Sequence, residues 1–117
     1  MMHELSITQN LIDLVAGECK KNNINHPKKI IAELGSLTGY SKESIQFYYD
    51  LLSKETPVLA GTELDIREIR AQILCNSCKK KSVITEPCMM FCNRCGSQDI
   101  DIISGREFIV KEIETED

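Results

Sequence analysis

The sequence predicts an α+β fold in which two helices pack on a small three-stranded sheet, with a cysteine-rich subdomain inserted into the chain. Three observations lead to this prediction. Segments with helical spacing alternate with short strand-like runs, four cysteines form two pairs within residues 75–95, and a strand pattern resumes after them. We therefore expect two domains, one of residues 1–73 plus 103–117 and one of residues 74–102.

Length and composition limit the classes of protein to consider. The chain has 117 residues, of which 42% are hydrophobic and 27% charged, and its formal net charge is −4. This acidic balance argues against a protein whose main partner is nucleic acid, because such proteins usually carry a basic surface. No apolar run approaches the roughly 20 residues of a membrane span, and the first residues lack the apolar core of a signal peptide. We expect a cytoplasmic protein with no membrane partner.

The first predicted helix covers residues 5–22. Ser6 followed by Gln9 is typical of a capping box, which places the start of the helix near Ile7. The predicted buried stripe has helical spacing and consists of Ile7, Leu11, Leu14, Val15 and Cys19. The turn-forming residues 22–27 then end the helix.

A strand and a second helix follow. Residues 28–35 alternate imperfectly and stop at Gly35, which predicts a strand. Ser41 is a suitable N-cap for a second helix, since its hydroxyl can accept a hydrogen bond from a free amide of the first turn. The apolar face of this helix comprises Ile45, Tyr48, Tyr49 and Leu52.

Two further strands are predicted on either side of the cysteine region. Residues 62–74 form a long strand whose alternation slips near residues 68–69, which indicates a bulge or bend. Residues 105–114 alternate again through Phe108 and Val110. This last segment is predicted to return to the first sheet.

The cysteine pairs predict a metal site. Cys75 and Cys78 form one Cys-x-x-Cys pair, and Cys92 and Cys95 form the other. Two such turns at the ends of paired strands can supply four thiolates to a tetrahedral zinc ion, so the inserted subdomain is interpreted as a zinc ribbon. A rubredoxin-type iron site uses similar spacing. A pair of redox motifs is less favoured, because the flanking sequence does not resemble the strand–helix start of a thioredoxin.

A site with four thiolate ligands is closed, so we expect structural zinc and no catalytic metal. Gly96, directly after the last ligand, suits the positive φ that such a turn often needs. Cys88 is then either a spare thiol or an alternative ligand, and Cys19 belongs to the core. Nothing else in the chain pairs a metal-ligand set with a general base, so we expect a protein that is not an enzyme.

The amino terminus carries a second candidate site at His3, next to Glu4. Nickel(II) and copper(II) accept square-planar sets of nitrogen and oxygen ligands. A chain starting at Met1 offers its amine, two backbone amides and the His3 imidazole, whereas a chain starting at Met2 offers only one amide and leaves a position open. The alternative is a solvated histidine. His26, which precedes Pro27 in a turn, is interpreted as either structural or solvent-exposed.

The whole chain resembles the HypA/HybF family of nickel metallochaperones, which mature nickel–iron hydrogenases. The resemblance rests on "MHELSI" at residues 2–7, "ELGSLTGYSKESIQFYYDLL" at 33–52, "TPVLAGTELDI" at 56–66, the paired cysteines followed by "GS", and the closing "GREFIVKEIE". The resemblance covers essentially the full length of the chain, and the motifs follow one another in the same order as in the family. Many members have proline after the third cysteine, where this chain has Asn93.

The resemblance implies an α+β nickel-binding domain joined to a zinc ribbon. Its nickel histidine and neighbouring acid map onto His3 and Glu4, and its zinc thiolates map onto the four paired cysteines. It also implies that Ni(II) is cargo, that a HypB-type GTPase is a partner, and that the nickel goes to the hydrogenase large subunit or, in some members, to urease. The protein is expected to be a monomer or a homodimer.

A zinc-ribbon module that docks on nucleic acid or a protein assembly is the alternative function. Lys79, Lys80, Lys81 and Arg94 give the ribbon a local positive face. The acidic whole chain and the few aromatic residues favour the metallochaperone instead.

Overall fold

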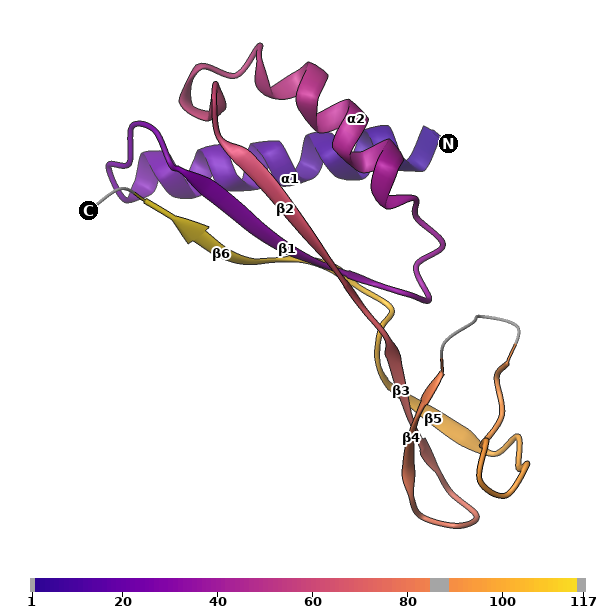
Figure 1. Ribbon diagram of the computed structural model, residues 1–117. Coiled ribbons are helices and arrows are strands. Elements are labelled where there is room, and N and C mark those ends of the chain that lie inside the picture. The colour runs from indigo at the N-terminus through magenta and orange to yellow at the C-terminus, as the bar shows by residue number, and fades with distance from the viewer. Residues whose placement is uncertain (1, 85–88, 116–117) are drawn as a thin grey trace. The chain divides into compact units, whose positions relative to one another are not determined.

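The computed structural model describes residues 2–84 and 89–115 (Figure 1). Its helical elements are α1 (Met2–Lys21), α2 (Lys42–Ser53) and the short 3-10 helix η1 (Pro57–Leu59). Its strands are β1 (Lys29–Gly35), β2 (Glu63–Ile69), β3 (Ala71–Cys75), β4 (Lys81–Ile84), β5 (Ile100–Ser104) and β6 (Phe108–Glu114). They form two three-stranded sheets in the orders β2-β1-β6 and β4-β3-β5. The predicted α+β class, with two helices and a small three-stranded sheet, is confirmed.

The first sheet is mixed. The amide of Glu63 donates to the carbonyl of Lys28 at 3.2 Å, so the starts of β2 and β1 lie together and the two strands run parallel. The amide of Lys28 donates to the carbonyl of Glu114 at 2.7 Å, so β6 runs antiparallel to β1. A parallel pair needs a long crossover, and α2 provides it. β6 comes from the other end of the chain, as predicted for the closing strand.

The chain divides into two compact units. Unit 1 comprises Met1–Ala32, Tyr40–Arg67 and Ile109–Asp117, and unit 2 comprises Glu33–Gly39 and Glu68–Phe108. The predicted partition into domains of residues 1–73 plus 103–117 and residues 74–102 stays a prediction. Met1 and Cys88 lie outside the described residues. Among the described residues, neither helix is long and apolar enough to cross a membrane.

Helix α1 begins earlier than predicted. It starts at Met2 instead of near Ile7, and the proposed capping box does not form, because the Gln9 amide donates to the carboxylate of Asp13 at 2.9 Å. Glu4 places a carboxylate in the first turn, where a negative charge favours the positive end of the helix dipole. His3 therefore lies inside the first helical turn.

The buried face of α1 also differs from the predicted stripe. Leu14, predicted to be buried, is 56% exposed, whereas Ile12 is fully buried. The buried side chains are Glu4, Thr8, Leu11, Ile12, Val15 and Cys19. Two of these residues, Glu4 and Thr8, are polar. A prediction from apolar spacing alone therefore placed the buried face of α1 at the wrong angle around the helix.

Helix α2 begins as predicted. The Ser41 hydroxyl accepts a hydrogen bond from the Ser44 amide at 3.2 Å. Tyr49 is buried, and its hydroxyl donates to the carbonyl of Thr62 at 2.8 Å. The Thr62 hydroxyl in turn donates to the carbonyl of Pro27 at 2.7 Å. This chain of bonds fastens α2 to the residues that enter β1 and β2.

The predicted strand 62–74 is divided between the two sheets. β2 ends at Ile69 and β3 starts at Ala71, so the break at Arg70 lies just beyond the predicted bend. In unit 2, one face of the β4-β3-β5 sheet carries a small core of Ala71, Ile73 and Ile84, with Leu37, Ile100 and Ile102 packed against it. This core is too small to offset much chain entropy by itself.

Three backbone segments of unit 2 approach very closely. A Cβ atom added at Gly35 would lie 2.2 Å from the carbonyl oxygen of Gly105, and one added at Gly105 would lie 2.5 Å from the Cα of Ala71. Gly105 also has a φ of 103°, which side-chain-bearing residues rarely adopt. Its carbonyl accepts a hydrogen bond from the Leu37 amide at 2.8 Å. Glycine is therefore required where these segments meet.

Candidate metal centre

The four paired cysteines converge on one point. The Sγ atoms of Cys75, Cys78, Cys92 and Cys95 all lie within 4.8 Å of one another. Cys75 Sγ is 3.6 Å from Cys95 Sγ, and Cys78 Sγ is 3.7 Å from Cys92 Sγ. A tetrahedron with metal–sulfur bonds of about 2.3 Å has edges of about 3.8 Å, whereas a disulfide bond is about 2.05 Å long. The spacing therefore fits four thiolates around one zinc-sized ion.

Each cysteine pair is shaped by backbone hydrogen bonds of the same kind. In the first turn, the Cys78 amide donates to Cys75 Sγ at 3.4 Å, and the Lys79 amide donates to the Cys75 carbonyl at 2.9 Å. In the second turn, the Arg94 amide donates to Cys92 Sγ at 3.4 Å, and the Gly96 amide donates to the Cys92 carbonyl at 2.8 Å. Two similar turns thus supply two sulfurs each to the cluster.

Further bonds hold the two turns together. The hydroxyl oxygens of Ser77 and Ser97 are 2.9 Å apart, and the Asn76 side-chain amide donates to the Asp99 carboxylate at 3.0 Å. The Cys92 amide donates to the Ser97 carbonyl at 2.8 Å. The centre is thus preorganised by the polar residues between and after the cysteines.

These turns favour the ionised form of two cysteines. Amide hydrogen bonds, first from Cys78 and then from Ser77, lower the pKa of Cys75 to about 6. Amide hydrogen bonds from Cys95 and Arg94 lower the pKa of Cys92. Cys75 and Cys92 are also the buried members of the cluster. Both shifts favour the thiolate, which is the form of cysteine that binds a metal ion.

The fourth thiol shows why a cation is needed. A hydrogen bond from the Ser97 amide lowers the pKa of Cys95, but the neighbouring Cys75 sulfur, partial desolvation and the Cys92 and Cys78 sulfurs outweigh it and raise that pKa to about 11. Four thiolates this close repel one another unless a positive charge lies between them. A divalent ion supplies that charge and allows all four to ionise. The residues present therefore fit a zinc ion.

One contributor to the centre was missed in the sequence. Lys79 has a φ of 63° and occupies the position after Cys78 that Gly96, with a φ of 79°, occupies after Cys95. The equal spacing of the two Cys-x-x-Cys motifs was the available signal for this positive φ. Lysine rarely adopts a left-handed conformation, so the residue type gave no reason to expect it. Gly96 was correctly interpreted.

The two candidate residues at the amino terminus, His3 and Glu4, differ in their exposure to solvent. His3 is exposed in the first turn of α1, whereas Glu4 is buried. The Ser41 amide donates to the Glu4 carboxylate at 3.0 Å, which joins the first turn of α1 to the N-cap residue of α2. This hydrogen bond is the main reason that the pKa of Glu4 lies below its ordinary value. Sequence reasoning treated Glu4 as a neighbour of His3 or as an acid at the start of a helix, and it missed the bond to Ser41.

We expect Glu4→Gln to destabilise the fold in a pH-dependent manner. The low pKa of Glu4 means that its ionised form stabilises the protein at neutral pH, and that this contribution is lost as the pH falls through the carboxyl range. Thermal unfolding of the nickel-free protein between pH 3 and pH 7 measures the effect. The melting temperature of Glu4→Gln is expected to be lower at pH 7 and to converge with that of the wild type in acid.

Glu55→Gln is the matched control, because Glu55 is an exposed residue just beyond the end of α2. It is expected to leave the melting temperature unchanged across the same pH range. An equal difference between Glu4→Gln and the wild type at every pH would contradict the role given to the Glu4 charge.

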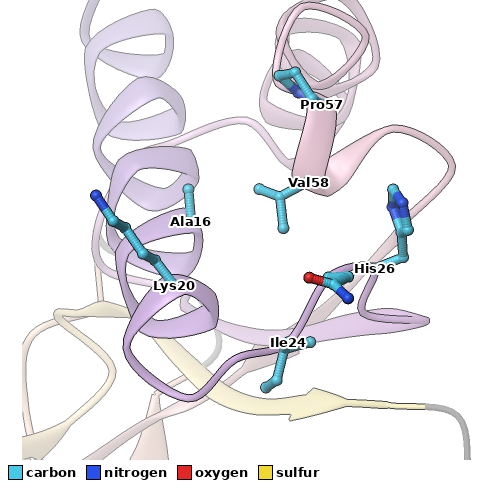
Figure 2. Close-up of a pocket in the computed structure, with 7 residues that line it drawn as sticks. Ala16, Lys20, Ile24, His26, Pro57 and Val58 are labelled. Carbon is cyan, nitrogen blue, oxygen red and sulfur yellow. The ribbon is translucent and has the colours of Figure 1, made fainter.

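His26 lies elsewhere in unit 1. It is exposed and lines an open groove of about 690 Å³, together with Ala16, Lys20, Ile24, Asn25, Pro57 and Val58. Figure 2 shows Lys20 on one side of the groove and His26 on the other. The lining contains no thiolate or carboxylate that could complete a metal site with His26. Of the two interpretations of His26, structural or solvent-exposed, the structure supports the second.

The fold and the site together are those of a small α+β protein in which two Cys-x-x-Cys turns form a four-cysteine cluster able to bind zinc. The family described as "Hydrogenase/urease nickel incorporation, metallochaperone, hypA" matches residues 2–115. The chain belongs to this HypA family, whose members are nickel metallochaperones in hydrogenase maturation and not enzymes.

Relatives and solved structures agree with this assignment. The hydrogenase maturation factor HypA of Caldanaerobacter subterraneus subsp. tengcongensis is 38% identical, over 98% of this chain and 100% of the relative. That of Rippkaea orientalis is 38% identical, over 99% and 97%. The solution structure of the nickel metallochaperone HypA from Helicobacter pylori matches with a TM-score of 0.71 at 21% identity, covering 96% of each chain. A second solution structure of a HypA protein matches with a TM-score of 0.73 at 23% identity, covering 98% of this chain and 97% of the other. At these identities the two structures support the fold alone.

Proposed function

We propose that the chain binds one nickel(II) ion at its amino terminus through His3 and delivers it to the large subunit of a nickel–iron hydrogenase. The observation that carries this proposal is the exposed His3 in the first turn of α1, in a chain of the HypA family. An exposed imidazole next to backbone amides near a chain terminus is a nitrogen-rich donor set of the kind that nickel(II) accepts. Urease is a second candidate target, in keeping with the family description.

The helical start of α1 bears on how this site would form. The first amides of a helix have no acceptor within the helix, so those of Met2 and His3 are not needed to hold α1 together. They project along the helix axis and do not converge on one point, so chelation by amides together with the imidazole requires the first residues to unwind. The bond from Ser41 to Glu4 holds the helix from its next residue onward. Loading would therefore reorganise only the residues before Glu4.

Residues at the start of α1 that unwind easily would also suit a protein that carries nickel and releases it. Ligands at the end of a chain can be exchanged one at a time, because few contacts hold the terminal residues. A HypB-type GTPase is the proposed partner in this transfer. The two candidate ligand sets, with the chain starting at Met1 or at Met2, differ by one amide nitrogen.

The role proposed for the four-cysteine centre is structural. Cys75, Cys78, Cys92 and Cys95 would hold zinc with no coordination position left for cargo. The small apolar core of unit 2 supports this role, because the metal would supply the cross-link that the core lacks. Metal analysis of the purified protein distinguishes zinc from a rubredoxin-type iron.

The test is a calorimetric nickel titration of the zinc-loaded protein and of two variants, with the amino terminus verified by mass spectrometry. We expect one nickel per chain in the wild type and at least about tenfold weaker binding in His3→Ala, because His3 supplies the only imidazole of the proposed set. His26→Ala is the matched control, since it removes the other exposed histidine. It is expected to bind nickel as the wild type does.

If His3→Ala binds nickel as tightly as the wild type, the amino-terminal site is wrong even though the family assignment stands. If His26→Ala loses nickel instead, the cargo site lies near the groove of unit 1. The titration thus separates the proposed ligand from the other histidine.

A further inference from the structure

The groove of unit 1 that His26 lines is bordered by apolar side chains. They are Ala16 of α1, Ile24 of the segment after α1, and Pro57 and Val58 of η1. Figure 2 shows Ala16 and Val58 on opposite sides of the groove. Apolar side chains in an open groove stay in contact with water until a ligand covers them, so covering them is favourable.

The polar groups of the groove carry no negative charge. They are the ammonium of Lys20, the side-chain amide of Asn25 and the imidazole of His26, each of which can donate a hydrogen bond. Within the described part of the chain, none of these three side chains has an ion-pair or hydrogen-bond partner. The carboxylate of Glu18 is 4.0 Å from the ammonium of Lys21 instead. In a chain with 18 acidic and 14 basic residues, this groove is therefore complementary to a negatively charged group.

The walls of the groove are held in place by the fold of unit 1. At the end of α1, the Ile24 amide donates to the Cys19 carbonyl at 2.8 Å. The Asn23 amide donates to the Lys20 carbonyl at 3.4 Å, and Asn23 has a φ of 59°. These bonds occupy carbonyls that would otherwise present partial negative charge at this end of the helix. On the other wall, the fully buried Leu59 anchors η1. Walls that are fixed before binding keep the entropy cost of binding low.

We propose that this groove binds an extended acidic segment of a partner protein, in which apolar side chains are flanked by carboxylates. The apolar side chains would cover Ala16 and Val58. The carboxylates would be bound by Lys20 on one side and by Asn25 and His26 on the other. The flexible stem of Lys20 lets its ammonium follow a carboxylate along the rim. A groove of about 690 Å³ that is open to solvent does not enclose a small molecule, whereas a peptide can lie along it and continue beyond both ends.

The groove lies away from the proposed nickel site. Ala16 follows His3 by 13 residues of the same helix, which corresponds to about 20 Å along the helix axis. A partner segment bound in the groove would leave His3 accessible. Binding in the groove uses none of the proposed nickel ligands, so this site goes beyond the proposed function and its test does not depend on nickel.

The test is fluorescence anisotropy of a labelled hexapeptide that has two leucines between two pairs of acidic residues. It is titrated with the full-length, zinc-loaded protein, free of nickel, at low ionic strength. The wild type is expected to bind the peptide saturably. Lys20→Glu places a negative charge in the groove, so it is expected to weaken binding at least about tenfold. Replacing the two leucines of the peptide by serines is expected to weaken binding at least about fivefold, because the apolar lining then stays uncovered.

Lys21→Glu is the matched control, because Lys21 is the neighbouring exposed lysine of α1 and does not line the groove. It is expected to bind the peptide as the wild type does, and a peptide with lysines in place of the acidic residues is expected not to bind. Circular dichroism establishes that each variant is folded. The proposal is overturned if the acidic peptide does not bind the wild type, if Lys20→Glu and Lys21→Glu have equal effects, or if the lysine peptide binds as tightly as the acidic one.

Discussion

Removing the metal ion with a high-affinity chelator is expected to unfold the ribbon sheet while α1 and α2 stay folded. The reason is the small apolar cluster on the β4-β3-β5 sheet, whose buried members, among the described residues, are Ala71, Ile73 and Ile84. Structural zinc contributes on the order of 10 kcal/mol to the folding of such small domains, which is more than this core can replace. Without a cation, the four clustered sulfurs no longer hold the two turns together. Hydrogen exchange read by NMR measures this: amide protection is expected to disappear in β3, β4 and β5 and to persist in both helices.

A pair of cysteine variants separates loss of metal from loss of packing. Cys19 and Cys92 are both fully buried, but only Cys92 belongs to the cluster. Cys92→Ala is expected to reproduce the effect of the chelator and to lower the zinc content to near zero. Cys19→Ala is expected to keep one zinc per chain and a protected ribbon. A ribbon that stays protected after chelation would show that packing alone maintains it.

Gly105→Ala is expected to be among the most destabilising single substitutions in the chain. An L-residue at its φ of 103° costs about 1–2 kcal/mol. The new Cβ would also lie 2.5 Å from the Cα of Ala71 and 2.7 Å from its Cβ, and backbone displacement of this kind costs about 1–3 kcal/mol. The sum of about 2–5 kcal/mol is a large part of the total stability of a small domain. Denaturant unfolding followed by circular dichroism gives the change directly.

Gly17→Ala is the control for that substitution. Gly17 lies within α1, and a Cβ added there meets no atom within 4 Å. The same chemical change is therefore expected to stabilise the protein by about 0.5–1 kcal/mol, because alanine favours the helix and restricts the unfolded chain. Opposite signs for the two variants would confirm that the close approach at Gly105 is responsible. Equal stability of Gly105→Ala and the wild type would contradict it.

The elements that could be predicted from the sequence are those coded by local spacing. The start of α2 followed from Ser41, and β1 followed from the apolar run that ends at Gly35. The cysteine cluster followed from two identical short spacings, since a Cys-x-x-Cys turn aims both sulfurs at one point whatever surrounds it. In each case the decisive signal is a short pattern of residues that are close together in the sequence.

The elements that were missed depend on partners far along the chain. Helix α1 starts at Met2 and buries Glu4 because Ser41, 37 residues later, donates to the Glu4 carboxylate. Leu14 is exposed and Ile12 buried because the face that meets the core includes polar residues that no hydrophobic stripe reveals. The strand 62–74 is cut at Arg70 because its two halves pair in different sheets.

By itself, the sequence determined the class of fold and the convergence of four cysteines, since both follow from short-range spacing and residue chemistry, whereas His3 became the candidate nickel ligand through the resemblance to a known family. Only the tertiary structure decided that Glu4 is a buried partner of Ser41 and that Gly35, Ala71 and Gly105 come into near contact. The physical reason is that these contacts join residues 20 or more positions apart, and only folding against a shared core or a shared strand brings such residues together.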